Sequence, residues 1–216
     1  MLDAIFPDDE CKNIEPQEDF SLDEFVSEPW YVQKQRVVYY LQPDRFFCTE
    51  ARYDPNGVNW ISRIFGWDIL VNNYDENAAG EGTVDGEGTP SNIFGLCAKK
   101  MGGNKYPSKL GVSPCFLFPA FFWAAIGPYW VIGFDNEAGW AVVSGGRPTI
   151  WTGSGCKNID NTGLWIFTRN QTGEAAQNAT LLALDAARDK GFDVDTLDDF
   201  FDVNQTDCRR DYDGFP

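Results

Sequence analysis

The sequence of 216 residues contains no histidine. This absence excludes a Ser-His-Asp triad, a Cys/His zinc site and a pH switch built on an imidazole. Basic residues are also few, with 17 Lys and Arg against 33 Asp and Glu, so the formal net charge is −16. Because nucleic-acid backbones are bound by basic surfaces, this charge argues against a nucleic-acid partner.

The first ten residues lack the basic segment and the long apolar core of a signal peptide, so we expect the numbered chain to begin near a processed N-terminus. Six cysteines are spread along the chain, and no two have Cys-x-x-Cys spacing. An even number of dispersed cysteines favours disulfides and therefore an oxidising compartment. Their spacing alone does not choose among the many complete pairings. No residue pattern suggests a metal site.

One long stretch, residues 110–134, has no charged side chain and is rich in aromatic residues. Its length would allow a transmembrane helix. Pro119, Gly127 and Pro128 would interrupt such a helix, and the aromatic and β-branched residues favour strands. We therefore expect two apolar strands joined by a loop.

Short runs rich in aromatic and β-branched residues recur along the chain and predict an all-β domain. We expect strands within residues 30–40, 46–53, 68–73, 91–99, 129–134, 140–144 and 164–169. The glycine-rich stretch 78–88 lacks the Lys-Ser/Thr ending of a phosphate-binding loop, so it is interpreted as a hairpin connection.

One helix is predicted near the C-terminus, with Thr172 as its N-cap, Glu174 near the positive end of its dipole and Gly191 as its stop. It should pack on the rest of the domain through one apolar face, made of Ala175, Ala179, Leu182 and Ala186. Many short strands followed by a packed helix indicate a closed barrel or a sandwich with an appended helix.

Several segments occur in a familiar order: the arm from Cys11, Trp30-Tyr31, Phe46–Tyr53, Pro128–Asp135, Leu164–Asn170 and Asn204–Cys208. In this order they resemble the lipocalins, and within them the apolipoprotein D-like branch with its plastid relatives, including the lipocalin domain of violaxanthin de-epoxidase. Two motifs depart from the family pattern. Its Gly-x-Trp is Glu28-Pro29-Trp30 here, and its Thr-Asp-Tyr is Phe134-Asp135-Asn136.

The resemblance implies an eight-stranded antiparallel up-and-down barrel with one C-terminal helix packed on the outside. It divides the chain into an irregular acidic N-terminal arm (1–26), the barrel (27–170) and a C-terminal helix with a disulfide-tethered tail (171–216). Trp30 would plug the closed end beneath the guanidinium of Arg169. The alternative is an ordinary core tryptophan and a solvated arginine.

The resemblance also implies disulfide partners. Cys11 would pair with Cys156, and Cys48 with Cys208. Cys97 and Cys115 would then form the third pair, with two buried free thiols as the alternative.

A lipocalin-like barrel would bind a hydrophobic small molecule without needing a cofactor. The resemblance implies a lipid, a carotenoid or a chlorophyll-type pigment. Roughly half of the candidate wall residues are expected to line the interior. These candidates are Tyr40, Phe46, Tyr53, Phe94, Phe122, Trp130, Val142, Trp151 and Trp165.

Two other function classes stay open. A de-epoxidase-like enzyme would need an acid beside the epoxide oxygen, and Asp44 is the one weak candidate. In the plastid relative a second aspartate follows, where this chain has Phe47, so Asp44 is interpreted as a turn residue after Pro43 and a non-enzymatic role is preferred.

The other class is a structural subunit docked on a membrane pigment–protein complex, such as an algal photosystem–antenna assembly. The segment FLFPAFFW motivates it, because neighbouring large apolar residues cannot all face a barrel interior. A dry loop over the barrel mouth is the alternative. The candidate membrane or partner contacts are Phe116, Phe118, Phe121, Phe122 and Trp123.

The compartment is left open between the thylakoid lumen and the extracellular space. Three Asn-x-Thr triplets, at Asn170, Asn178 and Asn204, would accept glycans if the chain passed through the endoplasmic reticulum. A thylakoid lumen would leave them bare.

Overall fold

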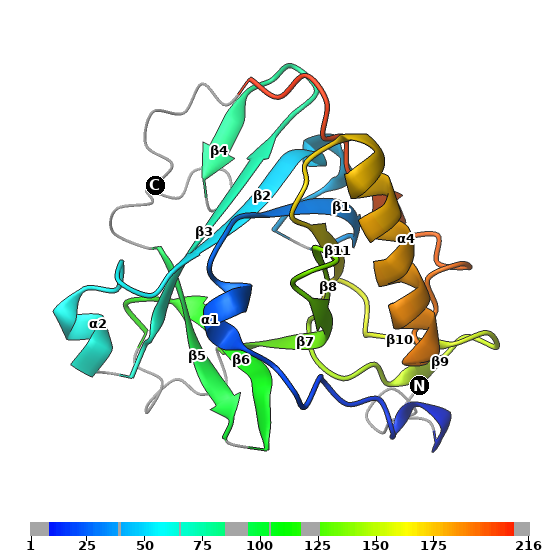
Figure 1. The fold of residues 1–216 in the computed structure, drawn as a ribbon, viewed down its shortest axis with the longest axis horizontal. Coiled ribbons are helices and arrows are strands. Elements are labelled where there is room, and N and C mark those ends of the chain that lie inside the picture. Colours follow the sequence, from blue (N-terminus) through cyan, green and yellow to red (C-terminus); the bar gives the residue numbers. More distant parts are fainter. Residues whose placement is uncertain are drawn as a thin grey trace.

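The computed structural model describes residues 9–38, 40–64, 66–84, 95–103, 105–117 and 126–209. Antiparallel strands form one closed barrel in the order β1-β2-β3-β5-β6-β7-β8-β11, and β11 pairs with β1 to complete the ring (Figure 1). The eight-stranded barrel implied by the resemblance is confirmed. The barrel strands are β1 (Trp30–Arg36), β2 (Phe47–Asp54), β3 (Ile69–Glu76), β5 (Leu96–Gly102), β6 (Tyr106–Pro114), β7 (Gly127–Asp135), β8 (Trp140–Ser144) and β11 (Leu164–Thr168).

Shorter elements lie around this ring. The described helices are η2 (Asp9–Cys11), α1 (Leu22–Phe25), η3 (Pro43–Arg45), α2 (Trp60–Ile64) and α4 (Gly173–Asp189). The remaining strands are β4 (Gly82–Val84), β9 (Ile150–Trp151), β10 (Cys156–Lys157) and β12 (Phe200–Asp202). β4 pairs with β3, in agreement with a hairpin connection at the start of the glycine-rich stretch.

Most of the described part of the charge-free stretch is β-structure, as the aromatic and β-branched content predicts. It contains the second half of β6 and most of β7, which pair with each other. No helix within the described ranges combines the length and the apolar character needed to cross a bilayer.

The alternation of side chains along β11 separates two apolar clusters. Leu164 and Ile166 point outward and pack with Ala183 of α4, whereas Trp165 and Phe167 belong to the cluster inside the barrel. Because neighbouring residues of a strand point to opposite faces, this assignment fixes the inner face of the strands paired with β11.

Helix α4 begins after Thr172 and is followed by Gly191 in a left-handed conformation, as predicted. The face that it buries differs from the prediction. Leu182 is exposed, and the buried residues are Ala176, Ala179, Ala183 and Ala187. A stripe of small alanines lets the helix approach the outer wall of β7, β8 and β11 closely (Figure 1). The two exposed leucines, 181 and 182, lie off this stripe.

The described part of the N-terminal arm, from residue 9, contains more regular structure than expected. Ser21 caps helix α1, because its hydroxyl accepts a hydrogen bond from the amide of Glu24. Phe20 and Phe25 then pack against Phe134 at the end of the barrel. The arm therefore contributes side chains to the barrel core, which its acidic composition concealed.

Trp30 plugs this same end of the barrel. Its side chain is fully buried, and its indole N–H donates to the carbonyl of Phe25 at 2.8 Å. The Arg169 guanidinium stacks 3.6 Å from the Trp30 ring centroid and donates to the carbonyl of Glu24. The structure therefore contains the stacked pair that the resemblance implied.

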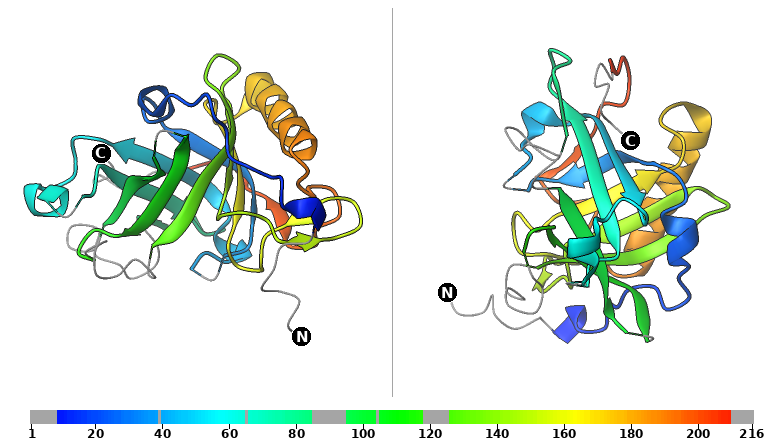
Figure 2. Two further views of the ribbon diagram at one scale, coloured as in Figure 1. Left: turned by 90° about the horizontal axis from the view of Figure 1, so that it is seen from below. Right: turned by 90° about the vertical axis from the view of Figure 1, so that its left-hand side faces the viewer.

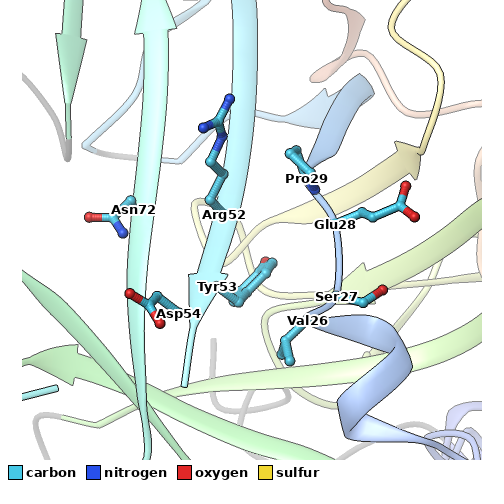
Figure 3. Close-up of a pocket in the computed structure, with 8 residues that line it drawn as sticks. All are labelled: Val26, Ser27, Glu28, Pro29, Arg52, Tyr53, Asp54 and Asn72. Atoms are coloured by element: carbon cyan, nitrogen blue, oxygen red, sulfur yellow. The ribbon is translucent and has the colours of Figure 1, made fainter. Parts of the chain in front are cut away.

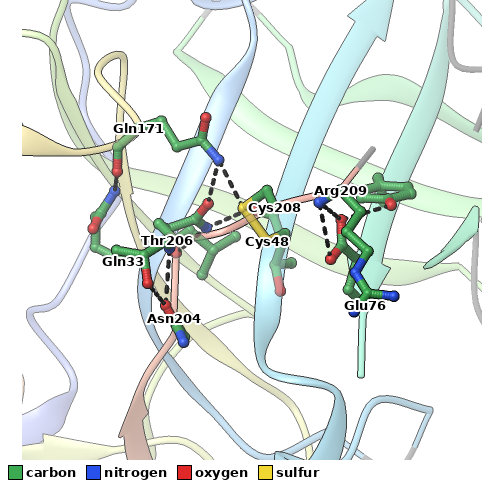
Figure 4. Close-up of a disulfide and its surroundings, with 12 residues drawn as sticks. Gln33, Cys48, Glu76, Gln171, Asn204, Thr206, Cys208 and Arg209 are labelled. Atoms are coloured by element: carbon green, nitrogen blue, oxygen red, sulfur yellow. Dashed lines mark hydrogen bonds between the residues drawn. A yellow bond between two sulfur atoms is a disulfide. The ribbon is translucent and has the colours of Figure 1, made fainter. Parts of the chain in front are cut away.

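All three expected disulfides are present: Cys11–Cys156, Cys48–Cys208 and Cys97–Cys115. The second one ties the C-terminal tail to the start of β2 (Figure 4). Strand β12 precedes this tail and pairs with the second half of β1, where β1 has already separated from β2. The amide of Gln205 fills the gap, because it donates to the carbonyls of Val32 and Thr49 at 2.8 Å each.

Candidate functional site

The inner face of the barrel carries a stacked aromatic pair. Tyr129 of β7 and Trp165 of β11 both point inward, with ring centroids 6.3 Å apart and planes 24° from parallel. Both side chains are only half-buried, although they face the barrel core. An inward-facing aromatic side chain that keeps solvent exposure marks a part of the inner wall that is not covered by other side chains.

Two apolar residues beside this pair share its partial exposure. Leu96 of β5 and Val112 of β6 pack against the inner cluster and are half-buried. By contrast, Val32, Val131 and Val143 of the same cluster are buried. The exposed part of the inner wall is therefore confined to one portion of the barrel.

A phenol–phenol hydrogen bond joins Tyr129 to β2. The hydroxyls of Tyr53 and Tyr129 are directly bonded, and Tyr53 is almost fully buried. Burial is the largest cause that raises the pKa of Tyr53, while its bond to Tyr129 acts in the opposite direction. Burial also raises the pKa of Tyr129 well above its usual value, and the nearby Tyr53 adds to the shift. Both phenols are therefore neutral at physiological pH.

A buried amide lies next to Trp165. Gln35 of β1 is directly opposite Trp165 in the β1–β11 ladder, so both side chains point to the same face. Gln35 is fully buried, and among the described residues neither its oxygen nor its nitrogen has a hydrogen-bond partner. The hydroxyl of Thr49 is buried without a partner as well. Each such group costs about 1–3 kcal/mol, so this polarity does not serve the fold.

Three of the residues predicted to line the interior belong to the inner cluster: Phe46, Tyr53 and Trp165. Phe46 is buried and contacts the ring of Phe201. Four residues of the inner wall were not among the candidates predicted from the sequence: Tyr129, Gln35, Leu96 and Val112. Tyr129 could have been predicted from the sequence, because it is the first residue of a predicted strand and directly precedes Trp130, which points outward.

Two predicted wall residues are on the wrong face of the barrel. Trp130 points outward, where the Lys109 ammonium lies 4.3 Å from its ring centroid. Val142 packs outside with Ile166 and Ala183, beneath α4. Both corrections have one cause: a one-residue difference in position reverses the face of a strand residue.

Two further candidates are on the surface. Trp151 lies on β9 of the separate β9–β10 pair and is 43% exposed. Tyr40 is 58% exposed in the connection between β1 and β2. Phe94 and Phe122 lie outside the described residues.

The weak catalytic candidate and one of the five candidate contact residues are also placed. Asp44 is exposed in the short helix η3 after Pro43, a turn position. Phe116 is 49% exposed. Phe118, Phe121, Phe122 and Trp123 lie outside the described residues.

A separate pocket of about 270 Å³ lies at the plugged end, between residues 26–29 and the strands β2 and β3 (Figure 3). Charged side chains contribute much of its lining, including Glu28, Arg52 and Asp54. This pocket therefore suits a hydrophobic molecule less well than the inner wall does. In the described ranges, no three acidic or cysteine side chains gather as a metal site would require.

No protein-family model matches the sequence, and no curated protein matches it. Solved structures do. Insecticyanin from the tobacco hornworm Manduca sexta matches with a TM-score of 0.55 and 14% identity, over 92% of this chain and 87% of that one. Apocrustacyanin C2 matches with a TM-score of 0.51 and 13% identity, over 91% and 93% of the two chains. The fold is that of the lipocalins.

The cockroach allergen Per a 4 shares this lipocalin fold with a TM-score of 0.50 and 13% identity, over 91% of this chain and 96% of that one. Identities this low establish a common fold only. The apolipoprotein D-like and plastid branches stay predictions.

Proposed function

We propose that this lipocalin-fold protein binds a hydrophobic small molecule, a lipid or a pigment, against the inner wall of its barrel. The half-buried Tyr129–Trp165 pair carries this proposal. Two stacked aromatic rings that face inward and remain partly exposed offer a flat apolar surface to a ligand. A ligand that covered them would remove that surface from water, at about 25 cal/mol per Å² of apolar area.

A binding role is preferred to catalysis for a structural reason. Ring opening of an epoxide needs a positioned acid within hydrogen-bond reach of the substrate. Asp44, the sequence-based candidate, is exposed in a turn. The polar groups beside the aromatic pair are a neutral amide and two neutral phenols.

Native mass spectrometry tests the proposal. The purified protein should carry a lipid or pigment of one-to-one stoichiometry, or take one up from a mixture of extracted lipids and carotenoids. Solvent extraction should release it. A protein that binds no member of such a mixture would refute the proposal.

A second candidate function is attachment to a membrane surface, and helix α2 favours it. Its residues Trp60, Ile61 and Ile64 are 71%, 48% and 70% exposed. Segment 115–117 lies against this helix, because the Ser62 hydroxyl donates to the carbonyl of Cys115 at 3.3 Å. α2 and α4 lie on opposite sides of the barrel (Figure 1, Figure 2).

The charge around α2 suits an anionic lipid surface. In this acidic chain, the sequence segments 55–67, 95–103 and 105–117 contain one arginine, four lysines and no acidic residue, with Asp54 and Asp68 flanking the first of them. Arg63 belongs to α2 itself, and Lys99 lies near the end of the helix, since a Cβ at Gly66, just after α2, would be 3.4 Å from the Lys99 ammonium. Lys109, by contrast, is paired with Glu15 of the arm. At physiological salt, charges act over about 8 Å, so these local cations matter more than the net charge.

Co-sedimentation with vesicles of phosphatidylcholine and phosphatidylglycerol tests this attachment. The double variant Trp60→Ser, Ile64→Ser should lose most of the vesicle-bound fraction. A matched control exists on the far side, where Leu181→Ser, Leu182→Ser removes two exposed apolar side chains from α4. Equal binding of the two double variants would contradict the proposal.

The compartment and the larger assembly are proposals too. Three disulfides indicate an oxidising compartment. Both the extracellular space and the thylakoid lumen are compatible with three disulfides. A structural role beside a photosystem–antenna complex would require the thylakoid lumen. Fractionation of source membranes decides: co-migration with a pigment complex supports the structural role, and recovery in the soluble pool contradicts it.

A further inference from the structure

We infer that the ligand of the inner wall is uncharged and presents a neutral hydrogen-bonding group, such as a hydroxyl or a carbonyl, beside Trp165. This inference rests on the proposed binding function and deepens it by naming the chemical class. It follows from which side chains the barrel turns inward and from which of them lack partners.

The inward-facing residues of the described barrel wall carry almost no charge. Asp75, near the end of β3, is paired with Arg45 and bonded to Thr83 of β4. Lys100 lies beyond the part of β5 that pairs with β3 and is exposed to solvent. Apart from Asp75 and Lys100, the inward-facing side chains of the described strands are apolar or carry a neutral amide, hydroxyl or phenol group. They include Val32, Gln35, Thr49, Ala51, Tyr53, Val71, Asn73, Leu96, Ala98, Val112, Tyr129, Val131, Val143, Trp165 and Phe167.

An ionised ligand would find no compensating charge on this wall. Moving a carboxylate or an ammonium out of water is unfavourable unless an opposite charge or several hydrogen bonds replace the lost hydration. The two phenols are also held neutral, since burial raises the pKa of both Tyr53 and Tyr129. The wall therefore discriminates against both anions and cations.

A neutral polar group would find partners. The amide of Gln35 has an unused donor and an unused acceptor next to Trp165, and the hydroxyl of Thr49 is unused as well. Both groups are covered in this structure, so a ligand would reach them by displacing the side chains that cover them. A hydroxyl or carbonyl oxygen needs one hydrogen bond of this kind to replace its hydration.

Three retinoids that share one apolar skeleton test the inference. All-trans-retinol and methyl all-trans-retinoate are uncharged, whereas all-trans-retinoic acid is ionised at pH 7.5. Competition titrations followed by retinol fluorescence should rank the two neutral compounds together, and the acid about tenfold or more weaker. Equal binding of the acid and its methyl ester would overturn the inference while leaving the binding function intact. The inference is also overturned if an extracted lipid binds and none of the three retinoids does. In that case the predicted preference for the two neutral retinoids is not observed.

A charge placed on the wall supplies the reciprocal test. Val112 is half-buried and inward-facing, so Val112→Lys brings an ammonium to the site while leaving its end near solvent. This variant should bind retinoic acid more tightly and methyl retinoate more weakly than the parent. Val112→Leu is the matched uncharged control: any change in affinity should be in the same direction for both compounds, so their parental ranking is kept. Thermal melting by circular dichroism verifies that each variant is folded, and a folded Val112→Lys that keeps the parental ranking contradicts the inference.

Discussion

Arg169 acts at several backbone groups at once. Its guanidinium stacks on Trp30 and donates to the carbonyls of Glu24 and Phe25, at 2.7 and 3.2 Å, and to that of Pro29 at 3.3 Å. These contacts connect the end of the last barrel strand to helix α1 and to the residue before β1. Burial lowers the Arg169 pKa to about 10, and the guanidinium is still charged at neutral pH.

Replacing Arg169 with methionine should therefore lower the free energy of unfolding by about 2–4 kcal/mol, because a cation–π contact and several hydrogen bonds to backbone carbonyls are lost. Urea denaturation at pH 7.5 measures this. Arg188→Met is the matched control, since Arg188 is an exposed helix arginine paired with two aspartates, and it should cost less than about 1 kcal/mol. Similar losses for both variants would contradict the plug.

Gly163 supports the position of Trp165. It has a φ of +87°, and a Cβ placed there would lie 2.2 Å from the indole ring. Gly163→Ala should displace the ring and strain the backbone, and so weaken retinol binding by about tenfold. Gly153→Ala is the control, since Gly153 also has a positive φ but nothing within 4 Å of its Cβ position. Unchanged retinol affinity in folded Gly163→Ala would show that the ring does not contact the ligand.

At the scale of elements, Asp193 joins the segment after α4 to the β9–β10 connection. Its carboxylate accepts hydrogen bonds from the hydroxyls of Thr152 and Thr196 and from the backbone amides of Asp195 and Thr196. Burial opposes ionisation, but these donors outweigh it and lower the Asp193 pKa to about 2.

Because the folded-state pKa lies below the unfolded value of 3.8, the stabilisation is present above pH 4 and is lost as the pH falls toward 2. Its size is about 2 kcal/mol. Asp193→Asn should lower the unfolding free energy at pH 7 by about this amount and flatten its decline between pH 4 and 2. Urea titrations across this range measure both effects, and a parental pH profile in the variant would contradict the assignment.

For the whole molecule, aromatic and β-branched runs predicted most of the strands and an all-β domain, and the family resemblance chose the barrel over a sandwich. Strand β6 begins earlier than its apolar half indicated, because Pro107, Ser108 and Lys109 interrupt that pattern. Helix α2 was missed, since five residues in a loop have no periodicity to recognise.

The candidate site was less predictable, because it depends on which face each strand residue takes. In the run Ala141-Val142-Val143 nothing in the composition distinguishes the valine beneath α4 from the one inside the barrel. A bulge between Val131 and Gly133 also shifts the alternation along β7. The unused amide of Gln35 could not be inferred at all, since partners are set by the folded chain.

The most direct test of binding against the inner wall is to titrate retinol into the parent protein and two tryptophan variants. The increase in retinol fluorescence reports binding. The parent should bind one retinol saturably. Trp165→Leu should weaken binding by about tenfold or more, whereas Trp130→Leu, which removes a half-buried tryptophan from the outer face, should leave it unchanged. Equal affinities for the two folded variants, or a larger loss in Trp130→Leu, would contradict the proposed site.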